Sequence, residues 1–100
     1  MYDMQQSSLF TAWFCGIKDR VIRGRIAARI ERVQLGNFGD AKSVGSGVHE
    51  LRLAFGPGYR IYFMQRGERI ILLLCGGDKG SQSHDIARAK QMATEVEQVT

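Results

Sequence analysis

Hydrophobic and polar side chains alternate along two stretches in the middle of the chain, residues 48–55 and 59–64. Alternation with a period of two is typical of strands that bury one face. A third stretch, residues 70–75, is apolar at every position, as in a strand covered on both faces. Turn sequences at residues 56–58 and 66–67 separate the three. The pattern therefore predicts an antiparallel meander of three strands.

The same alternation predicts the register of the first hairpin. If Phe55 and Tyr59 flank the turn, Leu53 pairs with Ile61 and both apolar rows share one face. The polar row on the opposite face consists of Glu50, Arg52, Arg60 and Tyr62. Arg52 is then a diagonal neighbour of Arg60, and two guanidiniums beside a carboxylate can form a phosphate site.

Helical spacing of apolar residues predicts a helix over residues 9–17, which Ser7 or Ser8 can cap. Its aromatic side chains are interpreted as core. Residues 1–8 are weakly patterned and fit either a short edge strand or a loose start.

A second helix is predicted over residues 20–35, with Gly36 and Asn37 as its stop signal. Gly24 weakens this helix, and one reason for a glycine there would be close packing against the preceding helix. Basic side chains at positions i, i+4 and i+7 line up on the same helix. They are Arg25, Arg29 and Arg32.

Residues 37–47 contain three glycines and are interpreted as a loop, with room for a short strand at residues 42–44. After the meander, Ser81 or Ser83 can cap a last helix that has Asp85 in its first turn. This order of elements predicts an α+β fold. We expect an antiparallel sheet of three to four strands, with the N-terminal helical hairpin on one face and a C-terminal helix.

Length and composition indicate one folded domain over residues 1–100, since 44% of the residues are apolar. No apolar run approaches the roughly 20 residues of a membrane span, and the N-terminus lacks the pattern of a secretory signal. We therefore expect a cytoplasmic protein with no membrane partner. Cys15 and Cys75 lie in apolar sequence and are expected to be buried thiols.

The net charge is +4, and ten of the fourteen basic residues are arginine. Arginine suits bidentate contact with phosphate or carboxylate, so nucleic acid or an acidic protein is favoured as a partner. A solvated basic surface is the simpler alternative. His49 and His84 have no partner at metal-ligand spacing, so we predict neither a metal site nor a cofactor.

Four segments, in this order, resemble the RelE/ParE superfamily of toxins, above all its HigB-like addiction module killer branch, which is related to a phage protein group. They are Gly36-Asn37-Phe38-Gly39-Asp40, Gly47-Val48-His49-Glu50-Leu51-Arg52, Gly56-Pro57-Gly58-Tyr59-Arg60-Ile61-Tyr62-Phe63 and Leu72-Leu73-Leu74-Cys75-Gly76-Gly77-Asp78-Lys79. The resemblance extends from about Phe10 to Ala93. Each segment alone is a weak signal, whereas the ordered series is specific.

The resemblance implies a growth-arresting toxin that a co-expressed antitoxin, of helix-turn-helix type, neutralises. RelE-like members are metal-independent endoribonucleases that cut messenger RNA, usually in the ribosomal A site. By position, the family's basic residue in the second strand matches Arg52, its Gly-Tyr-Arg arginine matches Arg60, and its basic residue after the last strand matches Lys79. The antitoxin is expected to cover the Arg52 and Arg60 face, or the basic helix that carries Arg25.

Metal-free RNA cleavage needs a base for the ribose 2′-OH, cations for the phosphorane charge and an acid for the leaving 5′-oxygen. Arg52 and Arg60 can hold the phosphate. Glu50 is a candidate base, or else a structural partner of Arg52. Lys79 or His84 can serve near the leaving group.

One feature of RelE-like toxins is missing here. Many members place an aromatic residue near the start of the C-terminal helix, where this chain has His84 and Asp85. ParE-like members inhibit DNA gyrase and have no nuclease site, and a non-catalytic nucleic-acid-binding module is a third possibility. The pair of Arg52 and Arg60 favours the nuclease.

Overall fold

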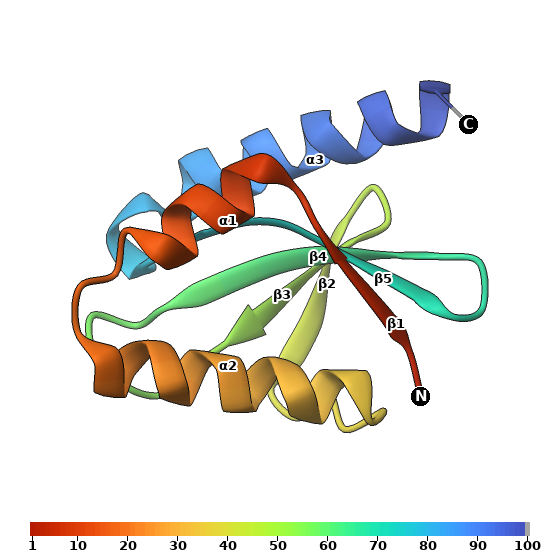
Figure 1. Ribbon diagram of the computed structural model, residues 1–100. Helices are drawn as coiled ribbons and strands as arrows, with labels where there is room; N and C mark the ends of the chain where they lie inside the picture. The colour runs from red at the N-terminus through yellow and green to blue at the C-terminus, as the bar shows by residue number, and fades with distance from the viewer. Residues whose placement is uncertain (100) are drawn as a thin grey trace.

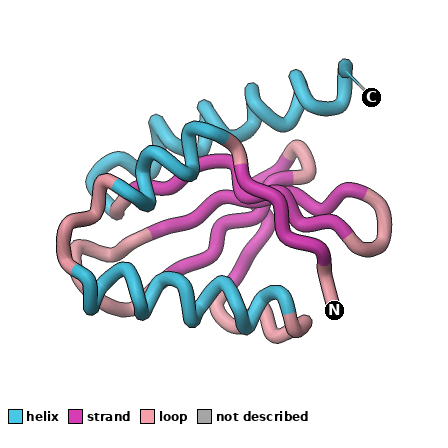
Figure 2. The backbone as a smooth tube through the Cα atoms, viewed as in Figure 1, coloured by secondary structure: helices cyan, strands magenta, loops and turns pink. Residues whose placement is uncertain are grey.

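The computed structural model describes residues 1–99, and side chains up to residue 97. The described part of the chain forms a twisted five-stranded sheet in the order β1-β5-β4-β3-β2, with helices on both sides (Figure 1). The elements are β1 (Asp3–Gln6), α1 (Ser8–Cys15), α2 (Arg20–Gln34), β2 (Ala41–Gly45), β3 (Val48–Arg52), β4 (Arg60–Arg66), β5 (Ile70–Gly77), a 3-10 turn η1 (Lys79–Ser81) and α3 (Gln82–Val99). In Figure 2 the strands form one layer, with α2 on one side and α3 on the other.

The predicted α+β class is confirmed, but the sheet has more strands than expected. Strands β2 to β5 form an antiparallel meander, and β1 pairs in parallel with β5, from Asp3 opposite Ile70 to Gln6 opposite Leu73. β1 is a short edge strand with few apolar residues. Met4 within it and Tyr2 just before it pack against the core, so the hydrophobic pattern indicated this strand only weakly.

The expectation that α1 and α2 form a hairpin on one face is confirmed only in part: Phe10 of α1 enters the same core as α2, but α1 itself lies along β5 at the edge of the sheet. β1 covers the first half of β5, and α1 then continues along the second half (Figure 1). Ser7 caps α1, and its hydroxyl donates to the Leu74 carbonyl of β5 at 2.5 Å. Because Gly76 has no side chain, the Trp13 ring lies directly against β5. α1 therefore shields the edge of the sheet.

Each face of the sheet has its own core. The α2-side core is built on Phe10, Ile26, Val33, Leu51, Leu53, Ile61, Phe63, Ile71 and Leu73. The α3-side core is built on Val48, Tyr62, Met64, Leu72, Leu74, Cys75, Ala89 and Ala93. Ile71 and Leu73 of β5 enter the first core, and the second core takes Leu72, Leu74 and Cys75, which confirms that this strand is covered on both faces.

The predicted register of the β3–β4 hairpin is wrong by two residues. Leu51, not Leu53, pairs with Ile61, and Arg52 lies directly opposite Arg60. The chain makes a wider turn because Gly56 and Gly58 adopt φ values of +63° and +78°. A shift of two residues preserves side-chain parity, so the division between apolar and polar faces is as predicted.

Gly24 does not mediate helix packing, contrary to the sequence interpretation. It is exposed, and a Cβ at this position would have no atom within 4 Å among those described. We expect Gly24→Ala to raise the free energy of unfolding by about 1 kcal/mol, because alanine is the better helix former. Urea denaturation measures this change. Gly76→Ala is the opposing control and should destabilise, since its methyl group would overlap Trp13.

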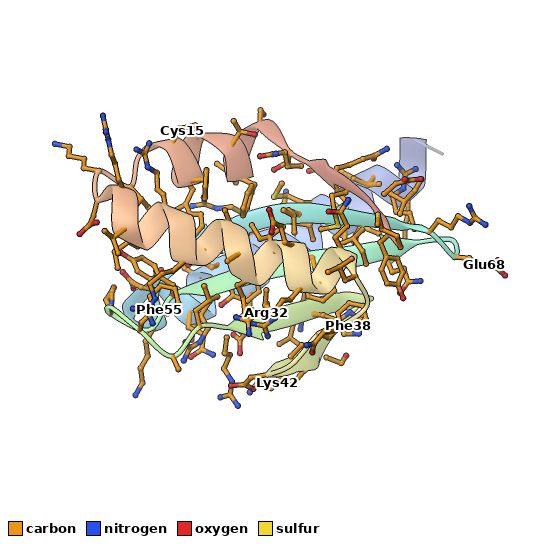
Figure 3. All side chains as sticks on the ribbon, turned by 60° about the horizontal axis from the view of Figure 1, so that its bottom comes forward. Cys15, Arg32, Phe38, Lys42, Phe55 and Glu68 are labelled. Carbon is orange, nitrogen blue, oxygen red and sulfur yellow. The ribbon has the colours of Figure 1, made fainter. Side chains whose placement is uncertain are left out.

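Cys75 is buried as predicted, whereas the prediction for Cys15 is wrong. Cys15 is the last residue of α1, and Figure 3 shows it on the outer side of that helix.

Among the described residues, no helix is long and apolar enough to cross a membrane.

Candidate nucleic-acid interface

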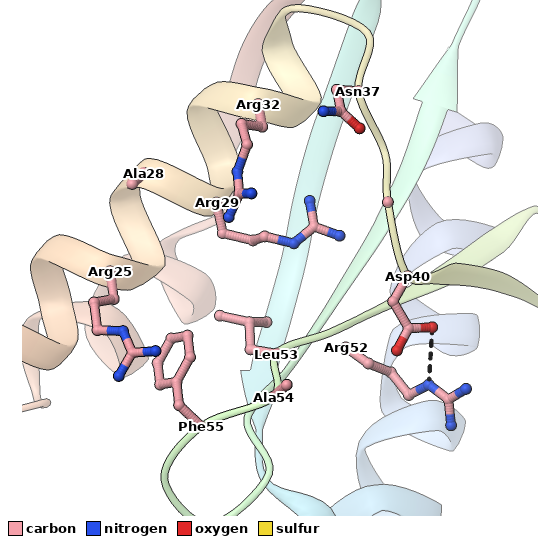
Figure 4. A pocket seen from close by; sticks show the side chains of 11 residues that line it. Arg25, Ala28, Arg29, Arg32, Asn37, Asp40, Arg52, Leu53, Ala54 and Phe55 are labelled. Atoms are coloured by element: carbon pink, nitrogen blue, oxygen red, sulfur yellow. Dashed lines mark hydrogen bonds and ion pairs between the residues drawn. The ribbon is translucent and has the colours of Figure 1, made fainter.

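A groove of about 450 Å³ lies between α2 and the end of β3 (Figure 4). Its lining is Arg25, Ala28, Arg29, Arg32, Asn37, Gly39, Asp40, Arg52, Leu53, Ala54 and Phe55. A second hollow of about 380 Å³ shares its wall from Arg52 to Phe55, together with Asp40, and adds Gly56, Gly58 and Arg60. We call the two hollows together the arginine groove.

The arginine groove joins two sets of residues that the sequence analysis treated as separate. Three of its arginines come from α2 and two from the β3–β4 hairpin. β3 ends at Arg52, so this side chain lies at the end of the sheet, where the hollow continues around to α2. Arg32 and Phe55 lie along the same side of the molecule in Figure 3.

Arg52 is positioned by Asp40, which sequence reasoning did not select. Its Nε lies 3.4 Å from Asp40 Oδ1, and its backbone N–H donates to the Asp40 carbonyl at 2.9 Å. The Arg52 side chain is 40% exposed, and an ion pair this exposed contributes at most about 1 kcal/mol. Arg52 can therefore leave Asp40 for a phosphate at little cost.

Arg60 is more constrained than its position on the polar face suggested. The residue is only 9% exposed, and its Nη1 donates to the carbonyls of Gly58 at 3.0 Å and Tyr59 at 3.2 Å. Its Nε is buried without a hydrogen-bond partner among the described residues. The Arg60 side chain therefore anchors the turn before β4.

Lys79 lies beside Gly58 in the turn that precedes β4. A Cβ on Gly58 would be 3.2 Å from the Lys79 Cβ and 3.4 Å from Arg60 Nη1, so both basic residues border this glycine. The Lys79 backbone N–H donates to the Pro57 carbonyl at 3.4 Å. The Lys79 side chain is exposed, which leaves its ammonium group available to a ligand.

The three arginines of α2 are not equivalent. Arg25 and Arg32 are exposed, whereas Arg29 is buried and its guanidinium donates to the Phe38 carbonyl. Burial lowers the pKa of Arg29, the charge of Arg32 lowers it further, and Asp40 opposes the shift. Arg29 therefore holds the segment after α2 in place, and Arg25 and Arg32 remain free to contact a ligand.

Glu50 faces the α3-side core rather than the arginine groove. Its carboxylate is fully buried and accepts hydrogen bonds from the Tyr62 hydroxyl at 3.0 Å and from Gln82 Nε2 at 2.7 Å. Lys42 Nζ lies 3.9 Å from its other oxygen. The alternative that Glu50 partners Arg52 is wrong, since Asp40 fills that place.

His84 lies at the exposed start of α3, outside the lining of the arginine groove. Its Nδ1 is 3.7 Å from Asp85 and 3.4 Å from the guanidinium of Arg88. No cluster of three His, Cys, Asp or Glu side chains that could hold a metal occurs in the part of the chain that the structure describes.

Two buried groups on the α3 side should make the fold sensitive to alkali. Burial raises the pKa of the Cys75 thiol to about 11, and burial together with the hydrogen bond to Glu50 raises the pKa of Tyr62. In the unfolded chain these groups ionise near pH 8.5 and 10. Their stabilising contribution is therefore complete below about pH 8.5 and is lost as the pH rises towards the folded values.

We expect the free energy of unfolding to fall above about pH 8.5, by up to about 1.4 kcal/mol per pH unit for each group. Urea titrations between pH 7 and 10.5 measure this slope. Cys75→Ala should remove the first part of the decline, and an unchanged profile in this variant would contradict the assignment.

Phe55 is on the apolar face as predicted and packs against the α2-side core. It also lines both hollows, with the Arg25 guanidinium carbon 4.0 Å from its ring centroid. The pairing depends on the tertiary contact between α2 and the turn after β3. No spacing in the sequence predicts this contact between Arg25 and Phe55.

The chain is similar to one known protein in sequence and to another in structure. No family model matches the chain. A protein of Haemophilus influenzae (strain ATCC 51907 / DSM 11121 / KW20 / Rd), described as an uncharacterized protein, is 46% identical over 87 residues, which is 87% of this chain and 88% of that protein. A chain in the crystal structure of the intact E. coli RelBE toxin–antitoxin complex is similar in structure. The TM-score is 0.62 at 11% identity, over 78% of this chain and 96% of that one, which indicates a shared fold.

Proposed function

Because this chain belongs to the same family as the Haemophilus influenzae protein and shares its fold with a chain of the RelBE complex, we propose that it is the toxin of a toxin–antitoxin pair. We assign it to the HigB-like branch by its four sequence motifs. We further propose that it is a cytoplasmic, metal-independent endoribonuclease that cuts messenger RNA on the ribosome. The observation that carries this proposal is the arginine groove, in which arginines from α2 and from the β3–β4 hairpin line one surface.

In the proposed reaction the ribose 2′-oxygen attacks the adjacent phosphorus, and the bond from phosphorus to the 5′-oxygen breaks. The 2′-OH loses a proton and the leaving oxygen gains one. Arg52 and Arg60 lie directly opposite each other on the neighbouring strands β3 and β4. They would bind the phosphate and stabilise its developing charge. Lys79, which borders the same turn as Arg60, is the better placed candidate for the leaving oxygen. His84 lies outside the groove, and the buried Glu50 is poorly placed to act as a base.

The proposed antitoxin would neutralise the toxin by covering the arginine groove. Its ligand there would be an acidic segment, since carboxylates and phosphates both suit arginine. The two alternative sites suggested by the sequence, on α2 and on the β3–β4 hairpin, border the same groove. One antitoxin segment could therefore block both, and its binding should weaken with salt.

Expression in cells followed by primer extension on abundant messages tests the nuclease proposal. We expect growth arrest with new cleavage ends for the parent protein and for Arg69→Ala, an exposed arginine outside the groove. Arg52→Ala should lose both effects. Intact messages during growth arrest would exclude the nuclease, and a supercoiling assay with purified protein would then test gyrase inhibition. A non-catalytic nucleic-acid-binding module predicts no arrest at all.

A further inference from the structure

Phe55 occupies the junction of the two hollows that form the arginine groove. Both Phe55 and Arg52 line the two hollows; the α2 arginines line the first hollow, and Arg60 lines the second. The Arg25 guanidinium lies over its ring, 4.0 Å from the centroid, and Figure 4 shows the two side chains together at the wall of the groove. A planar, apolar ring therefore lies among the cations of the groove.

Two neighbouring aromatic side chains hold the Phe55 ring in place. The Tyr59 ring packs at a tilt against Phe55, with 6.0 Å between centroids, and Trp13 packs edge-on against Tyr59 at 6.1 Å. The close approach of Tyr59 requires Gly56, because a Cβ there would lie 2.6 Å from a Tyr59 ring carbon. Gly56 also has a positive φ of +63°, which other residues rarely adopt. The position of Phe55 is thus fixed before any ligand binds.

This arrangement of flat and charged surfaces suits a nucleotide better than an acidic peptide. A peptide carboxylate needs only cations, whereas a single-stranded nucleic acid offers a planar base between two phosphates. Unpaired bases stack on aromatic rings and on arginine guanidinium planes. In a duplex the bases are stacked on one another and their faces are not available.

We propose that Arg25 and Phe55 form a stacking site for one unpaired base of a single-stranded RNA, whose flanking phosphates contact arginines on either side. The inference rests on the proposed function, because it assumes RNA in the arginine groove. It adds a position at which the protein contacts a base rather than the backbone.

Binding of 2′-O-methyl hexaadenylate tests this site, since the methyl group blocks the attacking 2′-oxygen and so prevents cleavage. Fluorescence anisotropy gives the dissociation constant, and an otherwise identical strand without bases is the comparison ligand. Stacking on one aromatic ring is worth enough to change affinity about tenfold. We expect Phe55→Leu to weaken binding of hexaadenylate about tenfold and to leave binding of the base-free strand unchanged. Phe55→Tyr, which keeps the ring, should bind like the parent protein.

A 2-aminopurine base in the hexamer adds a spectroscopic signal, because its fluorescence falls on stacking and should fall less with Phe55→Leu. Thermal melts of the Phe55 variants report whether the fold is intact. Equal affinity of Phe55→Leu and the parent for hexaadenylate would overturn the stacking site while leaving the proposed function in place. Failure of the parent protein to bind hexaadenylate would instead contradict RNA binding in the arginine groove, whereas primer extension in cells tests the proposed function separately. Equally tight, Phe55-dependent binding of hexaglutamate would overturn the base site in favour of a peptide.

Discussion

Replacing Arg60 with alanine is expected to reduce RNA cleavage by a factor of about 10² to 10³, the usual effect of removing one donor to a transition-state oxyanion. The structure supports this role through position, since Arg60 lines the second hollow and lies directly opposite Arg52. Single-turnover cleavage of messenger RNA on purified ribosomes measures the rate. Arg60→Lys should recover little activity, because lysine keeps the charge but lacks the planar fork.

Arg60→Ala should also cost about 1 to 2 kcal/mol of stability, since the side chain bonds two carbonyls of the turn before β4. Arg52→Ala is the matched control, because its exposed ion pair with Asp40 contributes little to the fold. If both arginines bind one phosphate, the double variant should lose less than the product of the single effects. An Arg60→Ala protein that cleaves RNA at the parental rate would refute the phosphate role.

Replacing Glu50 with alanine is expected to lower the free energy of unfolding by about 3 kcal/mol. The carboxylate is fully buried, and its removal leaves the Tyr62 hydroxyl and Gln82 Nε2 without their acceptor inside the α3-side core. Urea denaturation measures the loss. A matched Glu95→Ala variant on the exposed surface of α3 should change stability by no more than about 0.5 kcal/mol.

Glu50→Gln separates a structural role from a catalytic one. The amide oxygen can still accept from Tyr62 or Gln82, so most of the protein should remain folded at 25 °C. A structural Glu50 predicts cleavage close to the parental rate for this folded variant. Loss of a general base would instead slow cleavage by about 10² to 10⁴. A rate loss of that size in a protein that melts normally would restore Glu50 to the catalytic set.

The sequence by itself determined the elements and their faces. The period of two in residues 48–64, the continuous apolar run of β5 and the helical spacing in α1 and α2 predicted strands and helices close to those observed. Local chemistry predicted a cap at Ser7 or Ser8, and Ser7 is the cap. The face of each hairpin residue was also predictable, because side-chain parity survives a register error of two residues.

Tertiary structure alone decided how these elements meet. Hydrophobic spacing indicates which residues are buried but not in which layer, so the position of α1 along the edge of β5 followed from pairing of β1 with β5. The wide turn after β3 follows from two glycines with positive φ and sets Arg52 opposite Arg60. Whether a charged side chain is free to bind a ligand or is held by hydrogen bonds within the fold depends on partners far away in the sequence. Phe38 engages Arg29, and Tyr62 and Gln82 engage Glu50, because a buried polar group must find a partner wherever the fold supplies one.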